Sequence, residues 1–138
     1  MDAIELMVIL GEMKVRYRES DIEPGIEYFN SMIKDSRVII IRKDYLPYAV
    51  LTFSITDEPD KYLKKGPWEY LSHDVNGKTI YIEKLISKGW DKELRRDFES
   101  TLTFLYPQIE YGIWHRWAKW GDRQVITKVK RRVENVRN

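Results

Sequence analysis

The segment from Lys78 to Phe104 constrains the chain most, because it combines a strand, a turn and a helix around one acidic side chain. Lys78–Leu85 follows the Asn76–Gly77 turn signal and is rich in Thr, Ile and Tyr, a composition typical of β-strands. A helix is expected from Lys92, because Asp91 is a good N-cap and apolar residues then recur at spacings of three and four. The sequence therefore predicts a strand that leads through a short turn into an amphipathic helix.

The acidic side chain of this strand is Glu83, and its setting decides what it can do. Strict alternation places Glu83 on the same face as Tyr81 and Leu85, with Lys84 on the other. If another layer covers that face, burial disfavours the charged carboxylate and makes it more useful as a general base near neutral pH. If the face is open to solvent, Glu83 is an ordinary surface acid, as most strand acids are. The residues alone leave both interpretations open.

The turn after the strand, Ser87-Lys88-Gly89-Trp90, is a second feature of interest. Gly89 permits a positive φ angle, and the turn leads into the N-terminus of the predicted helix. Backbone N–H groups at such a place lack partners and can bind a phosphate or a pantetheine amide. The signal is weak by itself, since any strand-to-helix turn has this property.

Composition predicts one domain, residues 1–138, long enough to bury a sizeable core. With 43% hydrophobic and 33% charged residues, the chain resembles neither disordered nor membrane-embedded proteins. Residues 1–6 lack the features of a signal peptide. The absence of cysteine excludes disulfides, thiolate metal sites and a cysteine nucleophile. These observations predict a cytoplasmic protein in a reducing compartment.

The C-terminal segment, residues 111–138, differs from the rest in charge and aromatic content. Its net charge is +6, against −4 for the preceding 110 residues, which indicates an anionic partner such as nucleic acid, a cofactor phosphate or an acidic protein. Its tryptophans could stack on bases or line an acyl chain, or they could pack over the sheet or against a second subunit in a homo-oligomer. The residues expected to contact a partner are Trp114, Arg116, Trp117, Trp120, Lys130, Arg131 and Arg132. A charged edge strand is an equally good explanation of the basic residues.

His73 and His115 are the two histidines, and their spacing matches no metal-binding motif, so no metal site is predicted. His73 precedes Asp74, but a turn residue is a better interpretation of it than an acid–base pair. The sequence contains no Ser-His-Asp arrangement and no phosphate-binding P-loop motif.

The predicted elements follow a simple order. Helices are expected at Asp2–Arg18 and Ile26–Lys34, a hairpin at Val38–Ser54, and closing strands at Gln108–Arg116 and Arg123–Arg131, with the central strand and helix in between. This order predicts an α/β (α+β) fold on a mostly antiparallel sheet rather than a doubly wound one.

Several stretches in this order resemble the RTX toxin-activating lysine acyltransferases, a branch of the superfamily with the GNAT fold. The resemblance extends from about Ile9 to the last strand. It rests on the order and spacing of Leu10–Met13 with Ser20 downstream, Ile41–Ala49, Asn76–Lys78, and Ile80–Ile86 with Gly89 beyond. It implies a GNAT-like fold with a mostly antiparallel central sheet flanked by helices. Small proteins of this sort are also similar to proteins encoded by bacteriophages.

Members of that family move a fatty acyl chain from acyl carrier protein to a lysine ε-amine, using a histidine and a strand aspartate. The resemblance implies that Glu83 replaces the aspartate and that Glu23 stands where the histidine would be, so that two carboxylates would share the role of base. If the chain is such an enzyme, backbone N–H groups around Ser87, Lys88, Gly89 and Trp90 are expected to hold the oxyanion or the donor, either acyl carrier protein or acyl-CoA. One glycine replaces the glycine-rich loop of acetyl-CoA-dependent GNAT enzymes, so their pyrophosphate grip is not expected.

The missing histidine favours a second hypothesis. In it the chain is a catalytically inactive GNAT-like binding module, or a phage virion or host-interaction protein, that contacts nucleic acid or protein through its Trp-rich basic C-terminal segment.

Overall fold

The computed structural model describes residues 1–13, 15–117 and 123–129; from Arg116 onward it describes the backbone alone. Within this part of the chain, no helix combines the length and apolar character needed to cross a bilayer. Trp120, Lys130, Arg131 and Arg132, which were predicted to contact a partner, lie outside the described residues.

Five strands form one sheet in chain order, and only one pair of neighbours is parallel. The strands are β1 (Val38–Lys43), β2 (Leu46–Thr56), β3 (Thr79–Ser87), β4 (Tyr111–Trp117) and β5 (Arg123–Val129). The parallel pair is β3 with β4, because the chain crosses over through a helix between them. The prediction of a mostly antiparallel sheet flanked by helices is confirmed.

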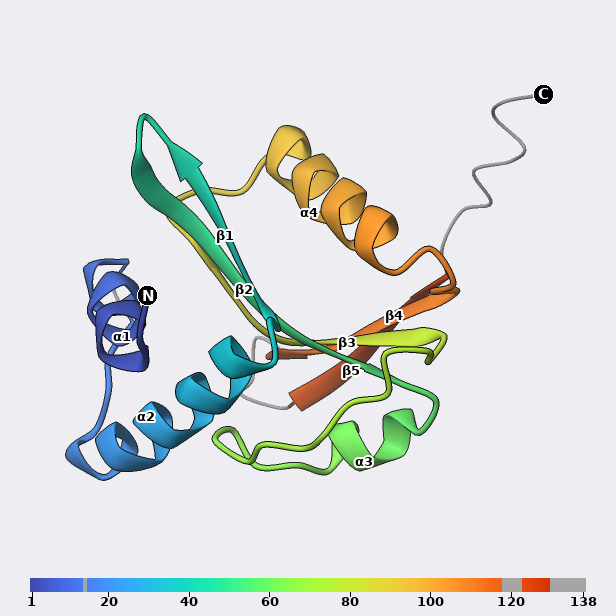
Figure 1. The fold of residues 1–138 in the computed structure, drawn as a ribbon, viewed down its shortest axis with the longest axis horizontal. Coiled ribbons are helices and arrows are strands. Elements are labelled where there is room, and N and C mark those ends of the chain that lie inside the picture. Colours follow the sequence, from blue (N-terminus) through green and yellow to red (C-terminus); the bar gives the residue numbers. More distant parts are fainter. Residues whose placement is uncertain (14, 118–122, 130–138) are drawn as a thin grey trace.

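Helices cover both faces of the sheet (Figure 1). They are α1 (Ala3–Glu12), α2 (Glu19–Lys34), α3 (Pro59–Leu63) and α4 (Lys92–Leu105). On one face α4 buries Leu94 and Phe98 against Leu51 of β2. On the other face lie α1, α2 and α3, and Phe29 of α2 packs with Val50, the neighbour of Leu51 along β2. Period-two alternation in β2 therefore supplies both cores.

Local sequence explains most element ends. The carboxylates of Asp2 and Asp91 accept hydrogen bonds from backbone N–H groups in the first turns of α1 and α4, as expected of N-caps. The hairpin turns at Asp44 and Tyr45, whose φ angles of 52° and 68° match the left-handed residues of a two-residue turn.

The predicted break before Ile26 is wrong, because α2 begins at Glu19 and includes Pro24. Proline lacks one backbone N–H, so the helix loses one hydrogen bond, near its start. The buried face that follows, which includes Tyr28, Phe29 and Met32, stabilises the helix despite this loss. The first helix is correspondingly shorter than predicted and ends at Glu12.

The segment between α3 and β3 is a loop that covers the α2 face of the sheet. Trp68 packs edge-on against Tyr28 and Phe29, with ring centroids 5.9 and 5.8 Å apart. At its end Gly77 passes close to β2: a Cβ at this position would lie 2.6–2.8 Å from backbone atoms of Thr56. The glycine therefore sets how closely the loop approaches the sheet.

We predict that Gly77→Ala destabilises the protein by about 1–3 kcal/mol, because the new methyl group meets backbone that cannot rotate away. Gly66→Ala, in the same loop, is the matched control, since a Cβ there has no neighbour within 4 Å. Urea denaturation of the two variants measures the difference. Equal midpoints would show that the loop is not held against Thr56.

Candidate functional site

The centre of the site is an irregularity in β3. Thr52 of β2 pairs with Lys84, whereas the next residue, Phe53, pairs with Ile82, so Glu83 is an extra residue in a β-bulge. A bulge turns two successive side chains toward the same face of a sheet. Lys84 accordingly lies over the rings of Tyr28 and Trp68, on the α2 side of the sheet.

Because of the bulge, not every side chain of β3 faces the side of the sheet that was predicted for it. Tyr81 and Glu83 share the α2 side, as expected from alternation. Lys84 joins them there, whereas Leu85 pairs with Leu51 and so faces the α4 side. Strict alternation failed at this point because one extra residue shifts every later side chain to the opposite face.

The Glu83 carboxylate is buried, with 2% of its side chain exposed, and four side chains contact it. One oxygen, Oε1, accepts a hydrogen bond from the Tyr28 hydroxyl at 2.8 Å and lies 2.9 Å from Lys65 Nζ. The other oxygen, Oε2, lies 3.1 Å from Arg37 Nη2 and accepts a hydrogen bond from the Ser54 hydroxyl. The interpretation of Glu83 as a solvent-exposed surface acid is therefore wrong.

The two cations around Glu83 are buried, and each also donates hydrogen bonds to backbone carbonyls. Lys65 also donates to the carbonyls of Gly66 and Glu69. Arg37 donates from Nε to the carbonyl of Phe53 and from Nη1 to that of Leu71, and it lies 3.6 Å from an Asp35 carboxylate oxygen. With Asp35 included, two positive and two negative charges balance, as burial of ionised groups requires.

The tyrosine at this site is a neutral hydrogen-bond donor. Burial raises the pKa of Tyr28 far above its usual value, and the negative charge of Glu83 raises it further. The Tyr28 hydroxyl also lies 3.2 Å from Thr52 Oγ1, so it links α2 to both β2 and β3. We call Tyr28, Arg37, Ser54, Lys65 and Glu83 the Glu83 cluster.

Glu23 is not among the groups that contact Glu83 in the described part of the chain. It is exposed on α2, five residues before Tyr28. Five residues of an α-helix rotate by about 140° beyond a full turn, so the two side chains leave the helix on different sides. The α2 residue that reaches Glu83 is thus Tyr28, which sequence reasoning missed. A buried aromatic residue on a helix gives no signal that distinguishes it from ordinary core.

The turn that was predicted to hold the acyl donor lies between β3 and α4, as expected. The structural reason for its glycine differs from the predicted one. Gly89 does not adopt a left-handed φ angle; instead a Cβ there would lie 2.6 Å from the Tyr48 hydroxyl oxygen. The Lys88 N–H donates to the carbonyl of Tyr48, so it is already paired, and Ser87 is the last residue of β3. Trp90 is half-exposed and stacks on Phe98 of α4.

Strands β3 and β4 separate immediately beyond their short parallel contact. They pair from Thr79 with Tyr111 to Ile82 with Trp114, and then β3 continues to Ser87 alongside β2 alone. Figure 1 shows β4 and β5 diverging from the C-terminal end of β3. We call this parting of the strands the fork. Glu83 is the first residue of β3 beyond it, and His115, whose Nδ1 lies 3.0 Å from the Tyr81 hydroxyl oxygen, is the first of β4.

The C-terminal residues predicted to contact a partner are only partly described. Trp114 lies in β4, directly opposite Ile82 and Ile126, and is half-buried. Arg116 and Trp117 end the same strand, with their backbones alone described. Partner binding by these residues stays a prediction.

A polar cavity lies beside α3, and His73 is one of the residues that line it. The cavity, of about 410 Å³, is lined by Asp57, Tyr62, His73 and Asp74 among others. His73 Nδ1 accepts a hydrogen bond from the Ile55 N–H at 3.2 Å. Burial lowers the pKa of His73, and the nearby Arg37 lowers it further. Among the described residues, no group of three or more metal-binding side chains is close enough to hold a metal ion.

We predict that Glu83→Gln lowers the free energy of unfolding by about 3–5 kcal/mol, because it leaves Arg37 and Lys65 buried without their shared anion. Glu99→Gln, which breaks a half-exposed pair with Arg95 on α4, should leave the unfolding midpoint nearly unchanged. Chemical denaturation compares them. Equal small effects would show that the Glu83 cluster is not a structural element.

We also predict that His73 makes stability depend on pH. Its pKa is lower in the folded than in the unfolded protein, where it is about 6.5, so the unfolded state binds more protons as pH falls. Stability from this residue is complete above pH 6.5 and declines below it. In His73→Asn, whose amide oxygen can accept the Ile55 hydrogen bond, the decline between about pH 7 and 5.5 should be smaller. Unchanged pH dependence would contradict this assignment.

No family model matches the chain, and no curated protein matches it. Among solved structures, the loading GNATL domain of CurA from Lyngbya majuscula is similar, with a TM-score of 0.59 and 12% sequence identity. The match covers 86% of this chain and 63% of that chain, so the protein spans less than two thirds of the length of its neighbour. At this identity the similarity shows the fold alone: the chain has the GNAT-like fold predicted from its sequence, and the narrower resemblance to RTX toxin-activating enzymes stays a prediction.

Proposed function

We propose that this protein binds an acyl thioester in the fork between β3 and β4 and transfers the acyl group to an amine, such as a lysine of a second protein. The observation that carries the proposal is the edge of β3 from Leu85 to Ser87, which has no strand partner in the described part of the chain. It lies in a GNAT-like fold, next to a bulge that contains an acidic residue.

The unpaired edge suits the arm of a thioester donor. From Leu85 to Ser87 one edge of β3 pairs with β2, and the other edge has no strand partner in the described part of the chain. Its backbone N–H and C=O groups can bind an extended chain as an added strand would. The pantetheine arm of acyl-CoA or of acyl carrier protein is such a chain, because it carries two amide groups.

The turn beyond this edge suits the phosphate end of the donor. Lys88 is exposed at the end of β3, and the N-terminus of α4 follows within four residues. An exposed ammonium group and the positive end of a helix dipole both attract phosphate. The Lys88 N–H is engaged with Tyr48, so Gly89 and Trp90 are the backbone donors we assign to the ligand.

In the reaction, the amine nitrogen attacks the thioester carbonyl carbon, a C–N bond forms, the C–S bond breaks, and the amine proton ends on the departing thiolate. Glu83 acts as an orienting carboxylate: it fixes the bulge, Tyr28 and the two cations, and its burial keeps it from direct contact with an exposed amine. The role of Glu23 as a second carboxylate stays a prediction.

One observation favours a second function, that of a binding module without catalysis. Both oxygens of Glu83 are occupied by side chains of the cluster, and Glu23 does not contact it. In this case the fork would bind a thioester or a peptide without transfer, and the basic C-terminal segment would contact nucleic acid or protein.

Binding and transfer can be measured separately. Octanoyl-CoA is titrated into ¹⁵N-labelled protein, and the proposal expects amide shifts at residues 83–90. Thiol release is then followed with a thiol reagent in the presence of a lysine-containing peptide; the protein has no cysteine, so it contributes no background. Binding with release supports transfer, and binding without release supports the module. Absence of shifts at residues 83–90, with octanoyl-CoA and with octanoyl acyl carrier protein, would overturn both assignments of the fork.

We predict that Lys88→Glu weakens octanoyl-CoA binding about fivefold, because it replaces attraction of an exposed charge for phosphate with repulsion. Lys64→Glu, an equally exposed lysine at the end of α3, is the control for the change in net charge. Titration calorimetry at low salt compares the two. Equal weakening would mean that Lys88 has no specific role.

A further inference from the structure

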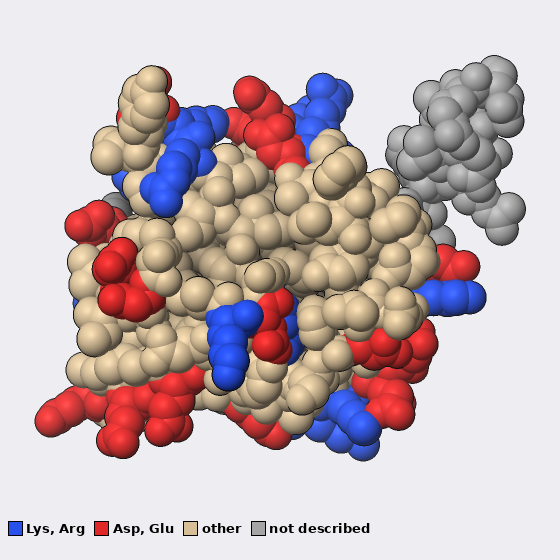
Figure 2. All heavy atoms as spheres, viewed as in Figure 1, with Lys and Arg blue, Asp and Glu red and all other residues tan. Residues whose placement is uncertain are grey.

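The outer surfaces of α1 and α2 are acidic. The two helices carry six acidic residues and one basic residue, Lys34. Figure 2 shows acidic side chains gathered over the edge of the molecule formed by these helices. The exposed acids next to groove-lining residues are Glu5, Glu12, Glu19, Glu23 and Glu27. Among the described residues of the segment between the helices, Arg16 and Arg18 are exposed cations.

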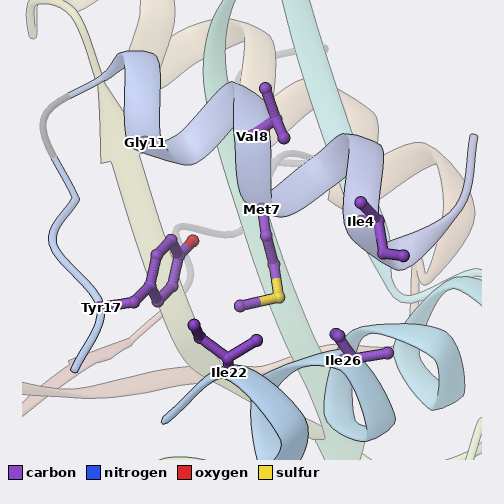
Figure 3. A pocket seen from close by; sticks show the side chains of 7 residues that line it. All are labelled: Ile4, Met7, Val8, Gly11, Tyr17, Ile22 and Ile26. Carbon is purple, nitrogen blue, oxygen red and sulfur yellow. The ribbon is translucent and has the colours of Figure 1, made fainter. Parts of the chain in front are cut away.

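The facing sides of α1 and α2 form an apolar groove (Figure 3), which we call the α1–α2 groove. It has a volume of about 220 Å³ and is lined by Ile4, Met7, Val8, Gly11, Tyr17, Ile22 and Ile26. Three of its aliphatic side chains remain largely in solvent: Ile4 is 60%, Val8 57% and Ile22 47% exposed. Clustered apolar residues of this size within a charged rim are typical of binding surfaces.

The groove also contains an unsatisfied polar atom. The Tyr17 hydroxyl is buried and has no hydrogen-bond partner, the only such side-chain atom among the described residues. Burial raises the pKa of Tyr17 to about 12, so the group is a neutral donor. Its oxygen points toward α1 (Figure 3). A buried hydroxyl without a partner is costly, and a polar group that entered the groove could remove this cost.

We propose that the α1–α2 groove binds an amphipathic helix of a partner protein, with apolar residues on one face and lysine or arginine on its flanks. The apolar floor would take the hydrophobic face of the helix, as in other helix-in-groove complexes. The flanking carboxylates would pair with the cations and steer the encounter. This proposal is independent of acyl transfer, and either can fail alone.

The acidic surroundings and the length of the α1–α2 groove favour a basic amphipathic helix over other ligands. A second copy docking through the same groove would bring two acidic rims together, and a fatty acid would bring its carboxylate to them. The lining residues of α1 run from Ile4 to Gly11, about 10 Å of helix axis. That length accommodates two turns of a partner helix, with anchors at i, i+3 or i+4, and i+7.

The probe is a synthetic peptide of about 18 residues, with leucine on one helical face and lysine on the other, and its leucine–glutamate counterpart. Fluorescence anisotropy at low salt measures affinity, and ¹⁵N amide shifts locate the site. We expect the lysine peptide to shift α1 and α2 residues and to bind at least tenfold more tightly than the glutamate peptide. Val8→Lys, which keeps helix propensity, should weaken binding at least tenfold. Phe104→Lys, at an 85% exposed position on α4, should change it less than twofold.

Two further variants test the rim and the floor. Glu12→Lys with Glu27→Lys should weaken binding of the lysine peptide, whereas Glu110→Lys, elsewhere on the surface, should not. Gly11→Phe should fill the groove, since a Cβ at Gly11 has open space around it, and Gly11→Ala is its control.

Three results would overturn the proposal. The first is lysine-peptide binding that Val8→Lys leaves unchanged, or amide shifts outside α1 and α2. The second is decanoate binding in the groove in the absence of peptide binding, which would indicate an alkyl-chain site. The third is self-association of the wild-type chain that Val8→Lys abolishes, measured by sedimentation, which would indicate a second copy.

Discussion

The structure depends on one buried carboxylate shared by two buried cations. The contacts of Glu83 join four parts of the chain: Tyr28 from α2, Arg37 from the residue before β1, Ser54 from β2 and Lys65 from the loop after α3. Removing any charged member leaves the opposite charge buried, so the group acts as a unit. The cluster holds the loop and α2 on the same side of the sheet, and it does so at the residue where β3 becomes irregular.

The same irregularity accounts for the incomplete sheet. Antiparallel pairing joins β1, β2 and β3, with one register shift in each pair, and it joins β4 to β5, while the described parts of β3 and β4 meet along only four residue pairs. Bulges increase local twist and bend a strand. The bulge therefore lies where β3 and β4 separate, and the edge of β3 from Leu85 to Ser87 has no strand partner among the described residues. A strand edge without a partner is an aggregation hazard unless something covers or uses it.

Sequence reasoning predicted the architecture well because hydrophobic periodicity and caps are local signals. The caps Asp2 and Asp91 and the hairpin of β1 and β2 could be predicted directly from the sequence. The cluster could not be predicted in the same way. Arg37 and Lys65 stand in no motif, and charged residues are seldom buried unless they are paired; these two are buried because the tertiary fold brings Glu83 to them. The bulge was also missed, since nothing in Ile82-Glu83-Lys84 marks an unpaired residue. Gly89 was identified as special, but close approach to Tyr48 rather than a left-handed φ explains it.

The bulge also accommodates the acid in β3 without changing how its neighbours pair with β2. Without residue 83, Ile82 would pair with Phe53 and Lys84 with Thr52 as they do now, in unbroken alternation through Ile86. Glu83 is therefore an insertion in an otherwise regular strand, and every other side chain of β3 is directed as it would be in the shorter sequence. Deleting residue 83 would thus preserve the direction of the other β3 side chains, but it would leave Arg37 and Lys65 buried without their shared anion.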